Sequence, residues 1–155
     1  MKIINSKLSD LILEKHSVAL GQFYFLKNFV VAEINEGAHV DFKASKEFIS
    51  LIIDFYGTEK PIGYICNRVN NFSLSPLDYP KFNKSLPNIT IFGIVHNNHF
   101  DRMNYEIEKR FCNKPYKSFS DLYSAVSQVS NFVTNVSKRV DITQSDSIVE
   151  DNLLN

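Results

Sequence analysis

The sequence predicts one α/β domain built on a mixed, mostly parallel β-sheet. Residues 17–36 contain two β-rich runs that meet at Lys27 and Asn28, as in a β-hairpin, because Asn tolerates the positive φ that tight hairpin turns need. The apolar runs Ile62–Cys66 and Ile89–Val95 then alternate with amphipathic helical segments. Strands separated by helices indicate right-handed crossovers and parallel pairing. We therefore expect about four helices on a sheet with an antiparallel N-terminal edge.

Composition and charge narrow the class of protein. The 155 residues suggest a single domain, and a hydrophobic share of 44% is typical of a globular chain. Lys+Arg and Asp+Glu both number 17, so the net charge is zero. This balance argues against a nucleic-acid partner, because such proteins usually carry a basic excess or stripe. Cys66 and Cys112 are too few for a disulfide scaffold, so we expect two buried thiols.

The N-terminal segment lacks the pattern of a signal peptide. Its longest apolar run is Leu11–Leu13, and charged residues follow directly. No stretch of the chain approaches the roughly 18 apolar residues of a membrane span. We therefore expect a cytoplasmic protein with no membrane span, in which residues 1–16 form an arm or a leading strand.

Two helices follow from cap signals. The segment Asp41–Tyr56 has a wide apolar stripe, with Asp41 as N-cap and Gly57 as the residue that ends the helix. A second, short helix is expected at Ser75, with Ser75 as its N-cap, Pro76 in the first helical position and Asp78 as the capping-box partner.

The second half of the chain completes the domain. The almost continuously apolar Ile89–Val95 suits a central parallel strand covered on both faces. Tyr116–Phe119 is expected as a short edge strand, and Ser120 as the cap of the last helix. From about residue 137 the apolar period stops, which predicts a domain over 17–136 and a disordered acidic tail over 137–155. The helix after residue 96 should bury a stripe made of Phe100, Met103, Ile107 and Phe111.

This layout resembles the STAS or SpoIIAA-like domain family, which includes anti-sigma factor antagonists; the lipid-binding CRAL-TRIO domains share its general shape. The resemblance covers about residues 17–134 and looks strongest to small uncharacterised bacterial members. It is carried by the strand FVVAEINEG with the helix DFKASKEFISLIIDFYG, by the strand–turn–helix PIGYICNRVNNFSLSP, and by YKSFSDLYSAVSQV. The resemblance implies a regulatory domain.

Phosphoregulated members of that family carry a Ser or Thr before the helix that follows the third strand, usually after an Asp and before Ser-Gly. The matching stretch, NRVNNFSLSP, has neither Asp nor Ser-Gly. Ser73 and Ser75 are its hydroxyl candidates for phosphorylation, and a phosphate at a helix N-terminus is electrostatically favourable. The missing motif argues against a kinase-controlled switch.

The densest polar cluster follows a buried strand, which is where sites form in α/β sheets. Arg68 offers a forked donor suited to oxyanions, so the cluster could hold a phosphate, a carboxylate or a partner's backbone. The alternative is that its asparagines only close a tight turn. The candidate binding residues are Asn67, Arg68, Asn70, Asn71 and Ser73.

A metal site or an acid–base pair has weaker support in the sequence than this binding cluster. His96, His99 and Asp101 have a spacing compatible with metal ligands, and His39 could fold nearby. No second cluster completes a ligand set, so we expect no metal and no cofactor. Glu33, Glu36 and His39 could form an acid–base pair. The sequence has no Gly-rich phosphate loop, G-x-S-x-G or H-E-x-x-H motif, so a non-enzymatic role is the better expectation.

Two functions fit these observations. The first is a non-enzymatic regulatory or protein-interaction domain with an unknown protein partner, as the family resemblance implies. The alternative is a small-molecule or lipid-binding domain with an apolar pocket between the sheet and the helices. Phe72, Tyr79 and Phe82 flank the short second helix and are expected either to be exposed for partner contact or to pack as a lid over the sheet.

Overall fold

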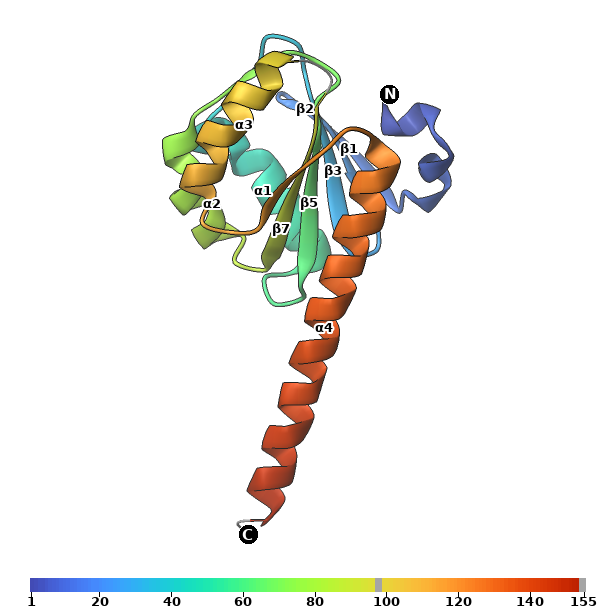
Figure 1. Ribbon diagram of the computed structural model, residues 1–155, viewed down its shortest axis with the longest axis vertical. Helices are drawn as coiled ribbons and strands as arrows, with labels where there is room; N and C mark the ends of the chain where they lie inside the picture. Colours follow the sequence, from blue (N-terminus) through green and yellow to red (C-terminus); the bar gives the residue numbers. More distant parts are fainter. Residues whose placement is uncertain (97–98, 154–155) are drawn as a thin grey trace.

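The computed structural model describes the backbone of residues 1–96 and 99–153, and the side chains of residues 1–96 and 102–145. A six-stranded sheet with the order β1-β2-β3-β5-β7-β8 forms its centre (Figure 1). β1, β2 and β3 are antiparallel, whereas β3, β5, β7 and β8 are parallel. The predicted class, a mixed α/β sheet with an antiparallel N-terminal edge, is confirmed. The strands are β1 (Glu14–Val18), β2 (Gly21–Phe25), β3 (Phe29–Ile34), β5 (Ile62–Asn67), β7 (Ile89–Val95) and β8 (Tyr116–Phe119).

Helices cover both faces of the sheet. α1 (Phe42–Tyr56), α2 (Tyr79–Ser85) and α3 (His99–Cys112) lie on one face, and α4 (Leu122–Leu153) crosses the other (Figure 1). Because side chains alternate along a strand, each strand feeds two cores. In β5, for example, Tyr64 packs in the core under α1–α3 and Ile65 in the core under α4.

The first helix forms as its cap signals predict. The Asp41 carboxylate accepts a hydrogen bond from the Ala44 backbone N–H at 2.7 Å. Gly57 ends the helix with a φ of 74°, a backbone conformation that favours glycine. Loss of such an N-cap typically costs about 1 kcal/mol of stability.

The predicted N-terminal hairpin is present as the antiparallel pair β2 and β3, and the structure adds elements before it. Two short 3-10 helices, η1 (Ile3–Asn5) and η2 (Lys7–Leu11), precede β1, and a turn at Ala19 and Leu20 separates β1 from β2. Gly21 is required after this turn, because a Cβ there would lie 2.3 Å from the Glu33 carbonyl oxygen. The edge is therefore a three-stranded meander.

The turn between β2 and β3 lies where the sequence predicts it, but it does not depend on a positive φ at Asn28. Asn28 does not adopt a positive φ; among the described residues other than glycine, only Asn113 does. The Asn28 side chain instead donates to the Ser130 carbonyl oxygen of α4 at 3.4 Å. It therefore links the turn to the helix on the opposite side of the sheet.

The predicted buried stripe of α3 is wrong. Met103, Ile107 and Phe111 are 73%, 48% and 39% exposed, and the Phe100 side chain lies outside the described residues. The helix instead buries Tyr105 and Glu108, together with Cys112. Hydrogen bonds from these polar groups to β8 and β5, described below, decide which face points inward.

The C-terminal helix also differs from the prediction. α4 continues to Leu153, through the segment expected as a disordered tail, since no Gly or Pro interrupts the sequence after residue 121. Asp121, rather than Ser120, accepts from the Ser124 N–H at 2.8 Å and so caps the helix. The division into arm, domain and tail stays a prediction. No helix in the described part of the chain is long and apolar enough to cross a membrane.

Two glycines let α4 lie close to the sheet. A Cβ on Gly63 would lie 2.3 Å from Val129 Cγ1, and one on Gly93 would lie 3.0 Å from Val129 Cγ2. Val129 and Val133 are fully buried against this surface. The absence of side chains on the two neighbouring strands therefore sets the distance between α4 and the sheet.

We expect Gly63→Ala to destabilise the fold by about 1–3 kcal/mol, because the methyl group overpacks the contact with Val129. This cost should exceed the roughly 0.5–1 kcal/mol that an alanine ordinarily gains over glycine in a strand. The measurement is the free energy of urea unfolding. The control Ser127→Ala, at an exposed position of α4, should change it by less than about 0.5 kcal/mol. A Gly63→Ala protein as stable as the wild type would contradict this account.

Candidate functional site

A pocket lies where the carboxyl ends of the central strands meet the N-terminus of α1. Its cavity volume is about 60 Å³, and it opens to solvent on one side. In open α/β sheets this edge is where ligands usually bind. Most of the surrounding side chains are apolar or aromatic, which is typical of small-molecule sites. The walls include Ile34, Val40, Phe48, Phe72, Leu74, Phe82, Phe92 and Ile94; Tyr64, Cys66, Arg68 and Tyr79 supply polar groups, and Asp41, Ser45, Ser75 and Asp78 lie toward the α1 N-terminus.

Two short strands that the sequence analysis missed form one side of this pocket. β4 (His39–Val40) and β6 (Ser73–Leu74) pair in parallel as a separate two-stranded sheet. The Ser73 N–H donates to the Ala38 carbonyl at 3.0 Å, and the Ser75 N–H donates to the Val40 carbonyl at 2.9 Å. This pairing fixes Val40 and Leu74 against the cavity.

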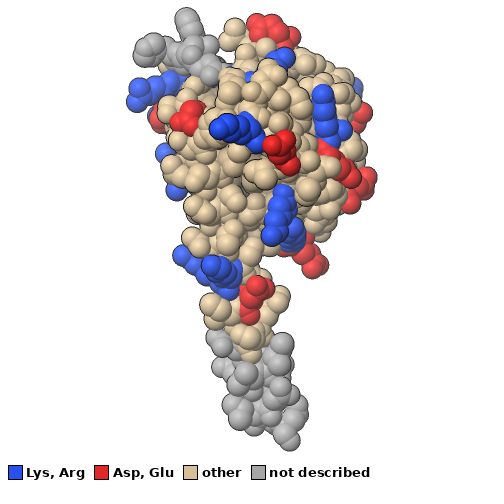
Figure 2. Space-filling view, turned by 90° about the vertical axis from the view of Figure 1, so that its right-hand side faces the viewer, with Lys and Arg blue, Asp and Glu red and all other residues tan. Residues whose placement is uncertain are grey.

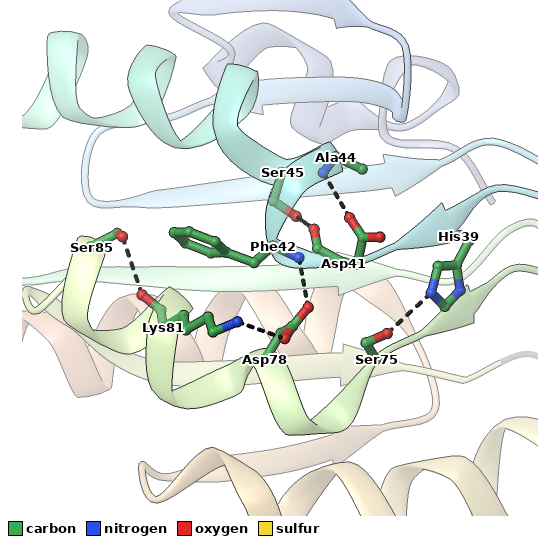
Figure 3. Close-up of polar contacts among 9 residues, drawn as sticks. All are labelled: His39, Asp41, Phe42, Ala44, Ser45, Ser75, Asp78, Lys81 and Ser85. Carbon is green, nitrogen blue, oxygen red and sulfur yellow. Dashed lines mark hydrogen bonds and ion pairs between the residues drawn. The ribbon is translucent and has the colours of Figure 1, made fainter.

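His39 links the two strands through both nitrogens of its ring. Nδ1 lies 2.7 Å from the Ser73 hydroxyl. Nε2 lies 3.1 Å from the Ser75 hydroxyl (Figure 3). Ser75 therefore does not cap the following turn, and no side-chain cap is present there. The prediction of a Ser75 cap is wrong, because its hydroxyl is engaged by His39 instead.

The Asp78 carboxylate also has a different partner from the one predicted. Its Oδ2 accepts from the Phe42 N–H, the first of α1, at 2.8 Å, and its Oδ1 lies 3.7 Å from Lys81 Nζ (Figure 3). Asp41 and Asp78 thus both accept hydrogen bonds from backbone N–H groups in the first turn of α1. Carboxylates are stabilised there by the helix dipole. The contact joins η3 (Pro76–Asp78) to α1 across the pocket.

Arg68, which lines the pocket, forms a buried ion pair. The Arg68 guanidinium pairs with the Glu108 carboxylate of α3, and both side chains are only 5% exposed. The Tyr116 hydroxyl donates to the same carboxylate at 2.6 Å. Burial disfavours the charged guanidinium, but nearby Cys66, Glu108 and Tyr116 outweigh burial and raise the pKa of Arg68 above its ordinary value. The arginine therefore stays charged.

Tyrosines extend this pair into a network. The hydroxyls of Tyr79 and Tyr116 lie 2.9 Å apart, and the Tyr105 hydroxyl donates to the Tyr116 carbonyl at 2.9 Å. The Arg68 guanidinium also lies 5.4 Å from the centre of the Phe72 ring, a cation–π contact. Tyr79 is buried, and Phe72 and Phe82 pack against the core. Of the two alternatives for these aromatics, packing as a lid over the sheet is the one observed.

The five residues of the predicted polar cluster do not converge on one point. Arg68 alone lines the pocket. Asn67 lies on the opposite face of β5, where its Nδ2 donates to the Met1 carbonyl and to Glu33 Oε1, both at 2.9 Å.

The other three residues of the cluster lie after β5 and hold neighbouring segments. Asn70 donates to the Ile34 carbonyl at 2.9 Å, and Ser73 contacts His39 as described. The Asn71 backbone N–H donates a hydrogen bond to the Glu36 carboxylate at 2.7 Å. Ligand binding by the whole cluster, and phosphorylation at Ser73 or Ser75, stay predictions.

The histidine and glutamate candidates form no metal site among the described residues. Within the described residues, no three His, Cys, Asp or Glu side chains lie close enough together to hold a metal ion. The side chains of His99 and Asp101 lie outside the described residues. Glu33 accepts from the Ile3 N–H at 2.7 Å and so holds the N-terminal arm, whereas His39 holds β4 to β6.

The Ser75–His39 contact has the spacing of a nucleophile and its base. An acyl-transfer site also needs donors for the developing oxyanion. Here the N–H groups of Phe42 and Ala44, at the start of the nearby helix, already donate to Asp78 and Asp41. The two carboxylates would also repel an oxyanion. These two N–H groups are therefore already engaged.

Sequence reasoning identified Arg68 but missed Tyr64, Cys66 and Glu108. Tyr64 and Cys66 alternate along β5 and Arg68 follows directly after it, so this period-2 pattern could have placed the three together. Glu108 carries no comparable local signal, since it lies on a helix remote in sequence. Its role follows only from the tertiary fold.

The comparisons with known proteins concern fold alone. No protein-family model matches the chain, and no curated protein matches it. Among solved structures, it is similar to a protein from Shewanella loihica PV-4 described as an uncharacterized protein from the DUF3478 family with a SpoIIAA-like fold. The two share 12% identity with a TM-score of 0.48, over 75% of this chain and 90% of that one.

Removal of one partner of the buried pair should be costly. We expect Glu108→Leu to destabilise the protein by about 3–5 kcal/mol, because it leaves the Arg68 charge buried without its carboxylate. The double variant Arg68→Met/Glu108→Leu should be more stable than the single variant, since no buried charge remains. Urea unfolding of the four proteins in this cycle measures both effects. A double variant less stable than Glu108→Leu would contradict the argument.

Stability should fall at alkaline pH. Burial raises the pKa of the Cys112 thiol from 9.0 to about 11 and raises the pKa values of Tyr64, Tyr79 and Tyr116 well above 10.0. As the pH rises, the unfolded chain loses these protons first, so it binds fewer protons than the folded chain and the free energy of unfolding decreases. The decrease should begin near pH 9, the ordinary pKa of the thiol. Urea unfolding from neutral to alkaline pH tests this, and a constant free energy would contradict it.

Proposed function

We propose that this protein is a non-enzymatic binding domain whose pocket takes a small, mostly apolar ligand. The observation that carries the proposal is the open pocket at the carboxyl edge of the sheet, walled mainly by apolar and aromatic side chains. A folded core normally closes gaps larger than a water molecule. An opening of about 60 Å³ at this edge therefore supports a binding role.

The surroundings of the pocket support the same interpretation. Phe48 stacks on Phe23 at 4.5 Å between ring centres, and Phe82 lies 6.0 Å from Tyr64 and 6.2 Å from Phe92. These rings are fixed by the core, so the walls are formed before a ligand binds. Preformed walls reduce the entropy that binding costs. The charge of Arg68 is balanced by Glu108, which leaves the pocket suited to an apolar molecule.

The test is an NMR titration of the ¹⁵N-labelled protein with 1-octanol. We expect saturable shifts of backbone amides around the pocket. Leu74→Trp should abolish these shifts, because Leu74 lines the pocket and the larger side chain fills it. The matched control is Leu77→Trp, three residues away in a position that is 74% exposed, which should leave binding unchanged. Native mass spectrometry of the purified protein would show any ligand that is retained.

Two outcomes count against the proposal. Octanol could cause no saturable shifts, or Leu74→Trp could bind it as well as the wild type does. In either case the pocket would be a packing defect and not a ligand site. A loss of binding in both tryptophan variants would also contradict it, because Leu77 lies outside the pocket lining.

A second candidate function is a regulatory protein-interaction domain, which the sequence resemblance implies. One observation favours it: Met103, Ile107 and Phe111 form an exposed apolar row along α3. Such a row is typical of helices that contact a partner. On another face of the molecule, basic and acidic side chains are interspersed without a stripe of one sign (Figure 2). This candidate becomes the better one if octanol fails to bind.

A further inference from the structure

A second hollow, the arm cleft, lies between the N-terminal arm and the meander. Its cavity volume is about 410 Å³, and it opens to solvent. Ile34 lines the apolar pocket and its neighbour Glu33 lines the arm cleft, so the two lie on opposite faces of β3. This volume falls in the roughly 300–1,000 Å³ range of small-molecule sites and far exceeds that of a few waters, at about 30 Å³ each. Its polar lining includes Lys2, Lys15, Gln22, Tyr24, Glu33 and Asn70.

The strand pairing of the meander gathers polar groups on this face. Gln22 lies directly opposite Glu33 on β3 and opposite Ser17 on β1. The Ser17 hydroxyl donates to Gln22 Oε1 at 2.6 Å, so Nε2 is the donor that this amide can offer to a ligand. Lys15 is paired with Tyr24, and its Nζ lies 5.8 Å from the centre of the Tyr24 ring. Amide, carboxylate, ammonium and phenol groups are therefore neighbours on one face of the sheet.

The N-terminal arm forms the other side of the arm cleft. Glu33, which is 3% exposed, holds it: Oε1 accepts from the Ile3 N–H at 2.7 Å and from Asn67 Nδ2 at 2.9 Å. Ile3 is fully buried in the core under α4, so the arm has a fixed place on the sheet. Lys2, the preceding residue, thereby lines the arm cleft together with Lys15 of β1.

The charges of the lining indicate the class of ligand. Lys2 and Lys15 come from separate segments, and within the described part of the chain neither forms an ion pair. Glu33 is the acidic residue of the described lining, and two N–H donors already bind its Oε1. The positive excess favours an anion. The carboxylate and amide groups suit hydroxyl groups, which both donate and accept hydrogen bonds.

We propose that the arm cleft binds a small anionic molecule rich in hydroxyl groups, of the class of sugar phosphates. Lys2 and Lys15 hold its phosphate group, since lysine ammonium groups bind phosphate as point charges. Gln22 and Glu33 form hydrogen bonds with its hydroxyl groups. This site goes beyond the proposed function, because it lies on the other face of the sheet from the apolar pocket.

The experiment compares glucose 6-phosphate with its two parts, glucose and inorganic phosphate. Each is titrated into the full-length ¹⁵N-labelled protein, and dissociation constants come from the NMR shifts. We expect saturable shifts of backbone amides in the arm, β1 and β2. Glucose 6-phosphate should bind at least about 10-fold more tightly than either part, the lower end of the range for one hydrogen bond to a charged group.

Two double variants with the same loss of charge test the site. Lys2→Ala/Lys15→Ala should weaken the binding of glucose 6-phosphate by about 10-fold or more, and both side chains are exposed, so the fold should persist. The matched control, Lys43→Ala/Lys46→Ala, removes two exposed lysines of α1 on the opposite face of the sheet and should leave binding unchanged.

Three outcomes would overturn the inference. The first is that glucose 6-phosphate does not bind, or binds no more tightly than inorganic phosphate. The second is that Lys2→Ala/Lys15→Ala binds it as the wild type does. The third is an equal loss of binding in both double variants, which would indicate attraction to the net charge of the protein. None of them bears on the apolar pocket, which the octanol titration tests separately.

Discussion

The buried pair of Arg68 and Glu108 is the interaction on which the candidate site depends. Charged side chains are rarely buried to this extent unless they are paired. Arg68 extends from the end of β5, and Glu108 comes from α3 on the same side of the sheet. The pair therefore fixes how α3 sits over the sheet. Tyr116 on β8 shares the Glu108 carboxylate, which ties the edge strand into the same contact.

Several features of the molecule follow from this constraint. α3 must turn Glu108 and Tyr105 inward, so its most apolar side chains, including Met103 and Ile107, face solvent. Arg68 lines the pocket, and its guanidinium lies near the Phe72 ring. The pair thus places a polar network beside a mostly apolar cavity. The core under α4, by contrast, needs no such device, because Gly63 and Gly93 let the helix pack directly on the strands.

Local signals in the sequence predict much of the fold. Asp41 and Gly57 bound α1 because each acts through its own backbone neighbours. The apolar run Ile89–Val95 becomes a buried parallel strand for the same local reason. The errors arise where a distant residue competes for a group. Ser75 has the local setting of a helix cap, but the His39 ring takes its hydroxyl, and Asp78 reaches Phe42 instead.

In the candidate site too, residues with a local signal were predicted and residues that depend on distant partners were not. Arg68 was identified because an arginine after an apolar strand is a local feature. Asn67 was grouped with it although its side chain points to the other face of β5 and holds the N-terminal arm. Tyr64 and Glu108 were missed, because neither a central strand tyrosine nor a helix glutamate is unusual by itself. Their importance depends on which groups surround them in three dimensions.

The central claim is that the pocket beside Tyr64 and Phe48 is a stable apolar cavity open to ligands. The most direct measurement is a crystal structure of the protein under xenon gas, because xenon enters small apolar cavities without needing hydrogen bonds. The account predicts a xenon atom among the rings of Phe48, Phe82 and Phe92, with the surrounding side chains unmoved. A xenon-free site, with these rings closed on one another, would contradict the account.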